Sequence, residues 1–382
     1  MAAARHEAAS FRGEDLLHAT MSAVTTLIAE SAQVTPEWLT EVLVGSGAVP
    51  AGASVVSFDP TSVGTGKLGE NVRFVLEWRD APDSAPVSVV GKFPSADPTS
   101  RAAGVLTGIY AREVNFYQQL ADRVKMRVPY CHFADLDVTT GEFALVFEDI
   151  TPARQGDQVS GCSVDEAALA MEQLALLHSS VWADPALEGR DWLAHRNADG
   201  GLALSNLYQS MVGTFTEQYD DRLSDRARGA AERFAPHVTD WLGSDREPCT
   251  LLHGDYRLEN MLFGAGPGAP PLTTVDWQTP SIGPGPSDAA YFLGAGLSID
   301  DRRAHERDLL EIYRGGLAAE GVDLDADECW AIYRVNTFTG LHMAVVASVL
   351  VGRDPRSDEM FLAMAERHAA HVDDLDAFDS FD

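Results

Sequence analysis

Apolar and polar side chains alternate along much of the first 150 residues, which is the period of half-buried β-strands. The clearest case is 71–78, where every second side chain from Val72 to Trp78 is apolar. Similar short runs lie at 54–60, 87–93, 128–135 and 142–149. A long helix is predicted between them at about 98–125, and a short one at 35–48, where a threonine cap precedes a proline. The pattern therefore predicts five strands and one long helix in this region.

The apolar period lengthens to that of helices from about residue 163. Helices are predicted at 163–183, 203–218, 220–242, 287–298, 301–320, 325–352 and 357–371. Between residues 250 and 288 the pattern is instead strand, loop, strand, loop, with a Gly- and Pro-rich turn at 265–271. Strands first and helices later predict an α+β fold with two lobes.

We divide the chain into four parts on this pattern. Residues 1–34 are an N-terminal leader, with Met21 as a hypothetical alternative start. Residues 35–150 are an N-lobe built from a sheet and a helix, and 151–372 are a mainly helical C-lobe. Residues 373–382 are an acidic tail, which we expect to be frayed.

The 382 residues include 58 acidic and 28 basic side chains, a formal net charge of −30. Nucleic acids and anionic membranes attract lysine and arginine, so we expect neither as a partner. The hydrophobic content of 45% is sufficient for a sizeable core. Only three basic residues are lysines (Lys67, Lys92 and Lys125), so a lysine inside a predicted strand is notable.

The cysteines and the ends of the chain indicate a compartment. The four cysteines are widely spaced without a C-x-x-C pair, which favours free thiols over disulfides or a zinc site. The first 20 residues lack the apolar run of a signal peptide, and the apolar stretch at 341–351 is too short to span a bilayer. We therefore expect a cytoplasmic protein, whose oligomeric state the sequence does not indicate.

Three glycines, Gly64, Gly66 and Gly69, form a G-x-G-x-x-G motif. A strand pattern follows it, so the motif lies in a hairpin, where protein kinases place their phosphate-covering loop. Glycine has no Cβ, so backbone N–H groups can approach a phosphate closely. Lys67 inside the motif adds a phosphate contact or points to solvent. An ordinary hairpin turn is the alternative.

Lys92 lies at the end of an apolar strand pattern. A lysine that binds nucleotide phosphates needs a carboxylate partner, usually from the helix that follows. Glu113 is the candidate, because it lies in the predicted helix whose apolar face includes Phe116 and Tyr117. The alternatives are a solvated edge lysine and a solvated glutamate.

The segment HGDYRLEN places Asp255 and Asn260 five residues apart, between apolar runs that can fix a loop. Asp255 can accept a proton from a substrate hydroxyl, and Asn260 offers an amide oxygen to a hard cation. Sixteen residues after Asn260, Asp276 ends an apolar strand pattern. Asn260 and Asp276 are thus a ligand pair suited to Mg²⁺ on phosphates. An Asx-rich turn beside a core strand is the alternative.

HGDYRLEN followed by VDWQ resembles the aminoglycoside phosphotransferase-like superfamily, which shares the protein-kinase fold. The segment 275–293 resembles the ecdysteroid kinase-like branch of that superfamily, through the glutamine after Asp276, a Gly-Pro turn and an aspartate that leads an aromatic helix. The segments GENVRF, E-x-x-F-Y and LVFED fit the same branch. The resemblance covers about residues 55–300.

The resemblance implies a role for each candidate residue. Asp255 is the catalytic base or the group that positions the hydroxyl, and Asn260 and Asp276 bind Mg²⁺. Lys92 contacts the α- and β-phosphates of ATP and pairs with Glu113. The hinge between the lobes, whose backbone would bind adenine, is formed by Phe147, Glu148 and Asp149. His253 and Asp288 are structural residues that hold the catalytic loop in shape. A metal-binding role for His253 is disfavoured, since no second histidine lies at ligand spacing.

Arg257 departs from many eukaryotic members of the branch, which carry tryptophan two residues after the catalytic aspartate. An arginine here can neutralise charge on the transferring γ-phosphate, or it can pair with a structural carboxylate. Both interpretations stay open from the sequence.

The combined prediction is a two-lobed protein-kinase-like enzyme that uses ATP and Mg²⁺ to phosphorylate an alcohol group of a small molecule. A nucleotide-binding pseudokinase is the alternative. It predicts that at least one of the four key residues is lost, but all four are present: Lys92, Asp255, Asn260 and Asp276. A serine hydrolase has little support without a G-x-S-x-G motif. The C-lobe helices contain many aromatic residues; an aromatic-rich pocket would favour a bulky apolar alcohol, as the resemblance suggests, whereas an acidic pocket would favour an aminoglycoside, and the sequence leaves both open.

Overall fold

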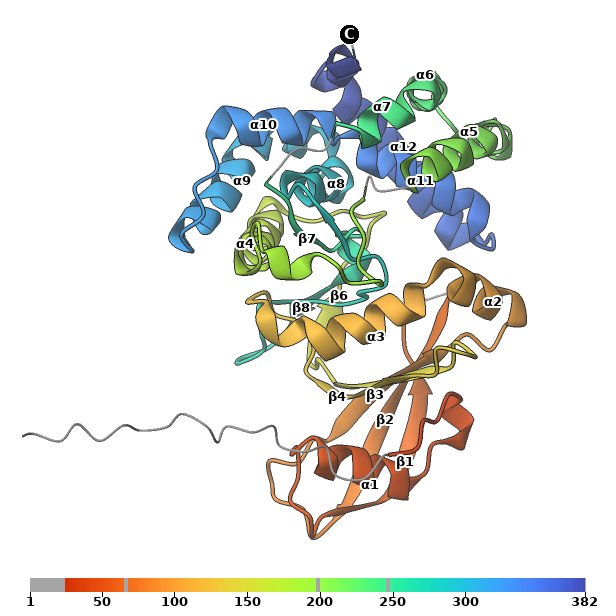
Figure 1. Cartoon of the computed structure of the whole chain (residues 1–382), viewed down its shortest axis with the longest axis vertical. Helices are drawn as coiled ribbons and strands as arrows, with labels where there is room; N and C mark the ends of the chain where they lie inside the picture. The colour runs from red at the N-terminus through yellow and green to blue at the C-terminus, as the bar shows by residue number, and fades with distance from the viewer. Residues whose placement is uncertain (1–24, 65–67, 197–199, 245–247, 382) are drawn as a thin grey trace, which may run out of the picture.

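A computed structural model describes residues 25–64, 68–196, 200–244 and 248–381. Figure 1 shows a sheet-containing N-lobe at one end of the long axis and a helical C-lobe at the other, with α3 between them. This is the two-lobed α+β architecture that the sequence predicts. In the described residues, no helix combines the length and the apolarity that a membrane span requires.

The N-lobe contains a five-stranded antiparallel sheet in the order β1-β2-β3-β5-β4. Its strands are β1 Ser54–Ser62, β2 Gly69–Arg79, β3 Ser88–Pro94, β4 Cys131–Leu136 and β5 Phe143–Glu148. The alternation in β2 has the predicted effect, because Val72, Phe74 and Leu76 are buried in one core cluster. All five predicted strands are present.

Helices cover both faces of this sheet. Helix α1 Pro36–Gly45 packs on β1 and β4, and Thr35 caps it by accepting a hydrogen bond from the Trp38 N–H. Part of the predicted leader belongs to this layer, since the Trp38 indole donates to Thr26 O at 2.8 Å and Val34 is buried. Met21 lies outside the described residues. Helix α3 contacts β4 and β5 on the side that faces the C-lobe.

The long helix predicted at 98–125 is wrong in one respect, because two helices occupy it. They are α2 Pro98–Thr107 and α3 Ile109–Gln119, separated by Gly108. Gly108 has φ 72°, a left-handed conformation that ends a helix and that glycine adopts at little cost. The break separates α2 from α3, the helix that contacts β4 and β5 of the sheet.

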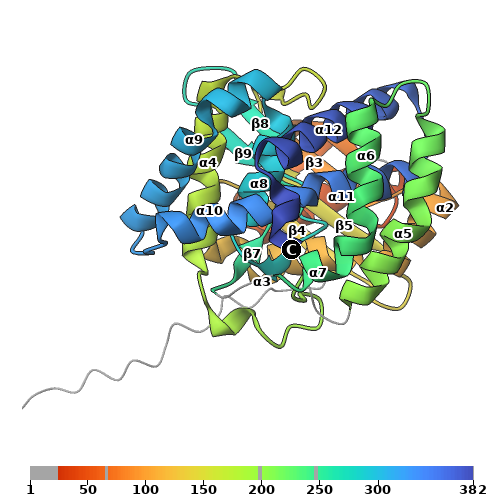
Figure 2. The ribbon, with the colours of Figure 1, turned by 90° about the horizontal axis from the view of Figure 1, so that it is seen from above.

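The C-lobe is built from nine helices in the described residues. They are α4 Val164–Ser180, α5 Gly200–Gln218, α6 Asp225–Phe234, α7 Val238–Leu242, α8 Pro286–Gly296, α9 Ile299–Ala319, α10 Ala326–Val335, α11 Phe338–Leu350 and α12 Pro355–Asp374. Figure 2 shows α4, α9 and α10 at one edge, α5 and α6 at the opposite edge, and α8, α11 and α12 between them. Every residue of α8 is buried, so this helix is the centre of the lobe.

Two helices predicted as continuous in the C-lobe are divided. The segment 220–242 forms α6 and α7, and 325–352 forms α10 and α11 with a break at Asn336. The Asn336 amide donates to the Ile332 carbonyl at 2.8 Å and accepts from Arg196 at 2.8 Å. Asparagine side chains that bond the backbone in this way favour the end of a helix over its interior.

Short strands form two small sheets in the described part of the C-lobe. Strand β7 Thr250–Leu252 pairs with β10 Ser281–Gly283. A second small sheet has the order β6-β8-β9, formed by Ala153–Gln155, Met261–Gly264 and Leu272–Thr274. The loop from residue 253 to 260 therefore begins on one sheet and ends on the other, which anchors both of its ends.

The predicted frayed tail is wrong for the described residues up to 381. Helix α12 continues to Asp374, and Ala377–Phe381 forms a short 3-10 helix. Ala377 and Phe378 are buried, and the Phe378 ring lies 4.9 Å from the Phe338 ring. Burial of these apolar side chains outweighs the local negative charge.

Candidate active site

The segment 253–260 is held by a buried aspartate of α8. The N–H groups of His253 and Gly254 donate to the two carboxylate oxygens of Asp288, at 2.7 and 3.2 Å. Asp288 is 2% exposed, and His178 Nε2 lies 3.5 Å from its Oδ2. The predicted supporting residue thus fixes the backbone just before Asp255.

His253 connects this loop to the segment that carries Asp276. Its Nδ1 accepts from the Asp255 N–H at 3.3 Å, so Nε2 carries the proton and donates to Val275 O at 3.1 Å. Both nitrogens are thereby used inside the protein. The ring is fully buried, which agrees with a supporting position rather than a metal ligand.

Gly254 is required by the same turn. Its φ is 79°, and a Cβ added there would lie 2.2 Å from Thr279 O. A larger residue would therefore both strain the backbone and collide with a carbonyl.

The Asp255 carboxylate accepts hydrogen bonds from three side chains. Arg257 Nε lies 3.0 Å from both oxygens, Asn260 Nδ2 donates to Oδ2 at 3.0 Å, and the Tyr291 hydroxyl donates to Oδ1 at 2.7 Å. Burial first, and then the Asp255 carboxylate, raise the pKa of Tyr291 well above its usual value. The hydroxyl therefore keeps its proton and remains a donor.

Arg257 pairs with two carboxylates of its own loop. Besides Asp255 it contacts Glu259 through Nη1, which also lies 3.1 Å from Met360 Sδ. Burial acts to lower the pKa of Arg257, but the carboxylates of Asp255 and Glu259 outweigh it and the pKa is raised. Of the two interpretations of Arg257, this structure contains the carboxylate pairing.

Lys92 lies between two carboxylates, one from each lobe. Its Nζ is 2.6 Å from Glu113 Oε2 and 2.8 Å from Asp276 Oδ1. Lys92 is 7% and Glu113 1% exposed, so neither is the solvated side chain of the alternative interpretation. Burial acts to lower the pKa of Lys92, but Asp276 and Glu113 outweigh it and the pKa is raised. The side chain is a fixed cation at neutral pH.

Asn260 and Asp276 lie on neighbouring segments. The Val275 N–H donates to Asn260 O at 2.9 Å, and Met261 pairs with Thr274 in the strands that follow and precede them. The Asn260 amide nitrogen is used by Asp255, whereas the amide oxygen has no hydrogen bond within the described part of the chain. The Asn260 amide oxygen can therefore serve as a neutral metal ligand, on a segment next to that of Asp276.

Asp276 adopts an unusual backbone conformation at the end of its segment. Its φ is 67°, which is uncommon for a residue with a side chain, and 36% of the side chain is exposed. Burial acts to raise the pKa of Asp276, but the Lys92 ammonium outweighs it and the pKa is lowered. Asp276 is therefore an accessible carboxylate, and strained backbones of this kind cluster at functional sites.

The glycine turn between β1 and β2 lies close to Lys92. A Cβ on Gly69 would be 3.2 Å from Phe93 O and 3.5 Å from Lys92 Cε. A hollow of about 230 Å³ opens here, lined by Gly64, Gly69 and residues 95–97 among others. Gly66 and Lys67 lie outside the described residues, so their phosphate contacts stay predictions.

The connection between the lobes follows β5, where the hinge is predicted. Phe147 is buried against Tyr117, with ring centroids 4.7 Å apart. Glu148 accepts from the Tyr130 N–H at 2.5 Å. Asp149 accepts from Arg73 Nε at 2.7 Å. These side chains are occupied inside the N-lobe, and adenine binding by the backbone of the hinge stays a prediction.

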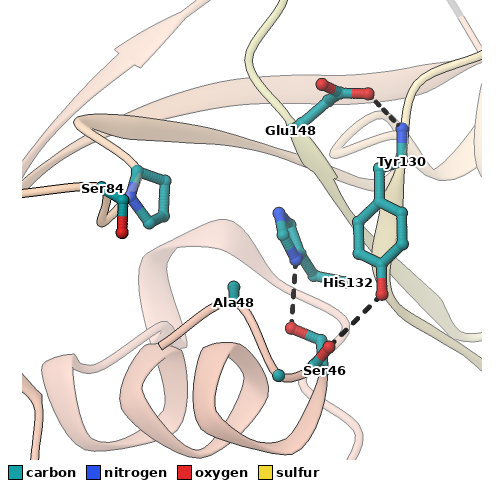
Figure 3. A pocket seen from close by; sticks show the side chains of 8 residues that line it. Ser46, Ala48, Ser84, Tyr130, His132 and Glu148 are labelled. Carbon is teal, nitrogen blue, oxygen red and sulfur yellow. Dashed lines mark hydrogen bonds between the residues drawn. The ribbon is translucent and has the colours of Figure 1, made fainter. Parts of the chain in front are cut away.

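A second hollow lies beside Glu148 and Tyr130, next to the end of α1. Its volume is about 370 Å³, and Figure 3 shows His132 and Tyr130 reaching towards Ser46 at the end of α1, with Glu148 above them. The distances are 3.0 Å from His132 Nδ1 to Ser46 Oγ and 3.3 Å from the Tyr130 hydroxyl to Ser46 O. Among the predicted site residues that the structure describes, only Glu148 lines it.

Comparison with known proteins places the chain in a family. The profile of the ecdysteroid kinase-like family matches residues 71–325, more than half of the chain. The chain belongs to the ecdysteroid kinase-like family. A comparison of this ecdysteroid kinase-like sequence with curated proteins found no match.

Solved structures show which fold this ecdysteroid kinase-like protein has. The GDP complex of a variant of aminoglycoside 2'-phosphotransferase-IIIa is similar, with 16% identity and a TM-score of 0.52, over 87% of this chain and 97% of that chain. Choline kinase from Cryptosporidium parvum Iowa II is similar too, with 8% identity and a TM-score of 0.54, over 89% and 98%. These likenesses establish the predicted protein-kinase-like fold.

Two residues around the site of this ecdysteroid kinase-like protein were not predicted. Tyr291 bonds the Asp255 carboxylate, and His178 lies against Asp288 while its Nδ1 is 2.8 Å from the Tyr313 hydroxyl. A signal for Tyr291 exists, because it follows Asp288 by three residues in a helix and so shares its face. His178 offered no comparable signal.

Proposed function

We propose that this protein is an ATP-dependent kinase that transfers the γ-phosphate of ATP to a hydroxyl group of a small organic acceptor. The observation that carries the proposal is the position of Lys92 between Glu113 and Asp276, beside the loop of Asp255 and Asn260. Residues that were predicted separately, from segments far apart in the chain, lie together here. Together they offer the cation, the carboxylates and the amide that phosphoryl transfer requires. Such a reaction asks a protein for positioning and for stabilisation of negative charge.

Lys92 and the glycine turn would hold the nucleotide. The Lys92 ammonium is fixed by its two carboxylates, so it can face the α- and β-phosphates without losing conformational freedom on binding. Gly64 and Gly69 carry no side chain at the two ends of the turn, and Gly66 and Lys67 would complete it. The backbone at Phe147, Glu148 and Asp149 would bind the adenine.

Asn260 and Asp276 would hold Mg²⁺. One ammonium against the carboxylates of Glu113 and Asp276 leaves a net negative charge, and Mg²⁺ in proteins prefers one or two carboxylate or amide oxygens together with substrate phosphates. An ion held by Asn260 and Asp276 would supply positive charge that offsets the negative charge of the phosphates. The Asn260 side chain is pre-oriented for this, because its amide nitrogen is held by Asp255.

Asp255 would receive the acceptor hydroxyl, as an acceptor of its hydrogen bond and of its proton. Arg257 covers both carboxylate oxygens in this structure, so the acceptor must displace it from at least one of them. Released from Asp255, the guanidinium would be available to the charge of the transferring phosphate.

The acceptor is proposed to be a bulky apolar alcohol, because the matched family is named for a steroid kinase and the C-lobe core is rich in aromatic side chains. An aminoglycoside is the second candidate. It is favoured by the similarity to a GDP and kanamycin complex of an aminoglycoside phosphotransferase, with a TM-score of 0.50 and 15% identity over 82% of this chain and 93% of that chain.

A mass-spectrometric screen for the gain of one phosphate tests the proposal. Steroidal alcohols, aminoglycosides and amino alcohols would be incubated with the protein, ATP and Mg²⁺. We expect transfer by the wild type and by Asp83→Asn, a change in an exposed turn, but none by Asp255→Ala or Asp276→Ala. Transfer by Asp276→Ala at the wild-type rate would exclude the proposed mechanism. Stabilisation by Mg·ATP without transfer to any acceptor would favour the pseudokinase instead.

A further inference from the structure

Helix α8 presents two side chains to the catalytic loop from one face. Asp288 and Tyr291 are three residues apart, and residues at this spacing lie above one another on a helix. Asp288 holds the backbone of His253 and Gly254, and Tyr291 holds the Asp255 side chain. The helix is buried along its whole length, so it is a rigid support for both contacts.

The Tyr291 ring is itself fixed by packing. It is 2% exposed, and it stacks on the His368 imidazole with centroids 5.9 Å apart and planes at 22°. His368 fills space that two glycines leave open, since a Cβ on Gly340 would lie 1.8 Å and one on Gly294 2.4 Å from its ring atoms. The ring therefore cannot turn its hydroxyl away without repacking the centre of the lobe.

The three donors to Asp255 differ in accessibility. Asn260 and Tyr291 are buried and take one carboxylate oxygen each, whereas Arg257 is partly exposed and straddles both. A carboxylate has about four lone-pair positions, and these contacts occupy them. An acceptor hydroxyl that arrives from solvent can replace the accessible donor but not the two buried ones.

We propose that Tyr291 is a positioning residue for phosphoryl transfer, and that its hydroxyl, opposite the Asn260 amide, fixes the rotation of the Asp255 carboxylate about its side-chain bond. The position vacated by Arg257 then faces the acceptor hydroxyl. This inference rests on the proposed function, and it adds to that function a residue of α8 that acts through Asp255.

Crystal structures of the wild type, Tyr291→Phe and Tyr208→Phe test the inference and require no activity assay. Tyr208 is a matched control, because it is fully buried and its hydroxyl donates to the backbone of Ala231, away from the proposed site. We expect the Asp255 carboxylate to rotate or to occupy more than one orientation in Tyr291→Phe and to stay in place in Tyr208→Phe. A carboxylate that stays within about 0.5 Å of its wild-type position in Tyr291→Phe overturns the inference.

Steady-state kinetics with an acceptor from the screen supply the second arm. Tyr291→Phe is expected to lower kcat about 10- to 100-fold, because a misplaced catalytic group costs about this much, while the KM for ATP stays within about twofold. Tyr208→Phe is expected to keep both values. A wild-type kcat in Tyr291→Phe overturns the inference and leaves the proposed function standing. If the wild type transfers no phosphate, the proposed function fails, and the crystal structures still decide whether Tyr291 fixes the Asp255 carboxylate.

Discussion

Lys92 and Asp276, 184 positions apart in the chain, form an ion pair of 2.8 Å that joins the two lobes. Lys92 comes from the central strand β3 and Asp276 from the segment after β9. The pair is shared with Glu113 on α3, so a single ammonium connects the sheet, its helix and the C-lobe. The proposed nucleotide site and the relative position of the lobes therefore share one contact.

Replacement of Lys92 by methionine is expected to abolish phosphoryl transfer and to lower the free energy of unfolding by about 3 to 5 kcal/mol, because Glu113 would stay buried without its cation. Adding Glu113→Gln is expected to restore part of the stability and none of the activity, since it removes the stranded charge but supplies no phosphate-binding cation. Urea unfolding and a turnover assay separate these two effects.

Lys125→Met is the matched control for that experiment. Lys125 pairs with Glu320 at the surface, where 58% of the lysine side chain is exposed. Surface pairs contribute little, so a change below about 1 kcal/mol is expected. Equal destabilisation by the two lysine substitutions would contradict the buried cluster as a structural element.

Removal of divalent cations is expected to abolish phosphoryl transfer, and Mg²⁺ is expected to restore it. We expect this dependence because the single charge of Lys92 faces the two carboxylates of Glu113 and Asp276, and the remaining negative charge can bind a cation. Asp276→Asn removes this excess and an anionic ligand, so the Mg²⁺ concentration for half-maximal turnover should rise on the order of 10-fold or more. Full turnover after dialysis against a chelator would count against the metal site.

Replacement of Arg257 by methionine distinguishes its two interpretations. If the guanidinium supports the transferring phosphate, kcat should fall at least about 10-fold with little change in the KM for ATP. Glu259→Gln provides the comparison, because it removes the other carboxylate that Arg257 pairs with and leaves the guanidinium in place. We expect a small effect of Glu259→Gln, and a wild-type kcat in Arg257→Met would reduce Arg257 to a structural partner of Asp255.

The candidate site was largely predictable because its residues lie in short, distinctive segments. Asp255 and Asn260 share one loop, and Asp276 follows at the end of the next strand pair, so local spacing carried most of the information. The pairing of Lys92 with Glu113 followed from the expected fold. Tyr291 was not predicted, since its contact depends on how α8 is placed against the loop, and only its spacing from Asp288 marks it.

The elements predicted incorrectly are those where a local feature opposed the average pattern. Gly108 divides a region with continuous helical periodicity, and Asn336 does the same between α10 and α11. At the C-terminus the opposite occurred, because the acidic composition suggested fraying while Phe378 and Phe381 pack against Phe338. In each case one side chain or one backbone conformation decided the outcome, and composition over a window hides such single positions.

Acidification is expected to destabilise the protein through its buried histidines. Burial lowers the pKa of His342 to about 4, and burial also lowers that of His368. The unfolded chain, with a histidine pKa of about 6.5, then binds the proton more readily, so the stability that neutral His342 contributes is complete above pH 6.5 and is lost as the pH falls towards 4. Between pH 6.5 and 5 this amounts to about 2 kcal/mol for one such histidine. The net charge of −30 acts oppositely, since acid also relieves repulsion, so the measurement is the difference in urea unfolding between the wild type and His342→Gln at several pH values. A difference that does not change between pH 7 and 5 would show that His342 does not titrate in this way.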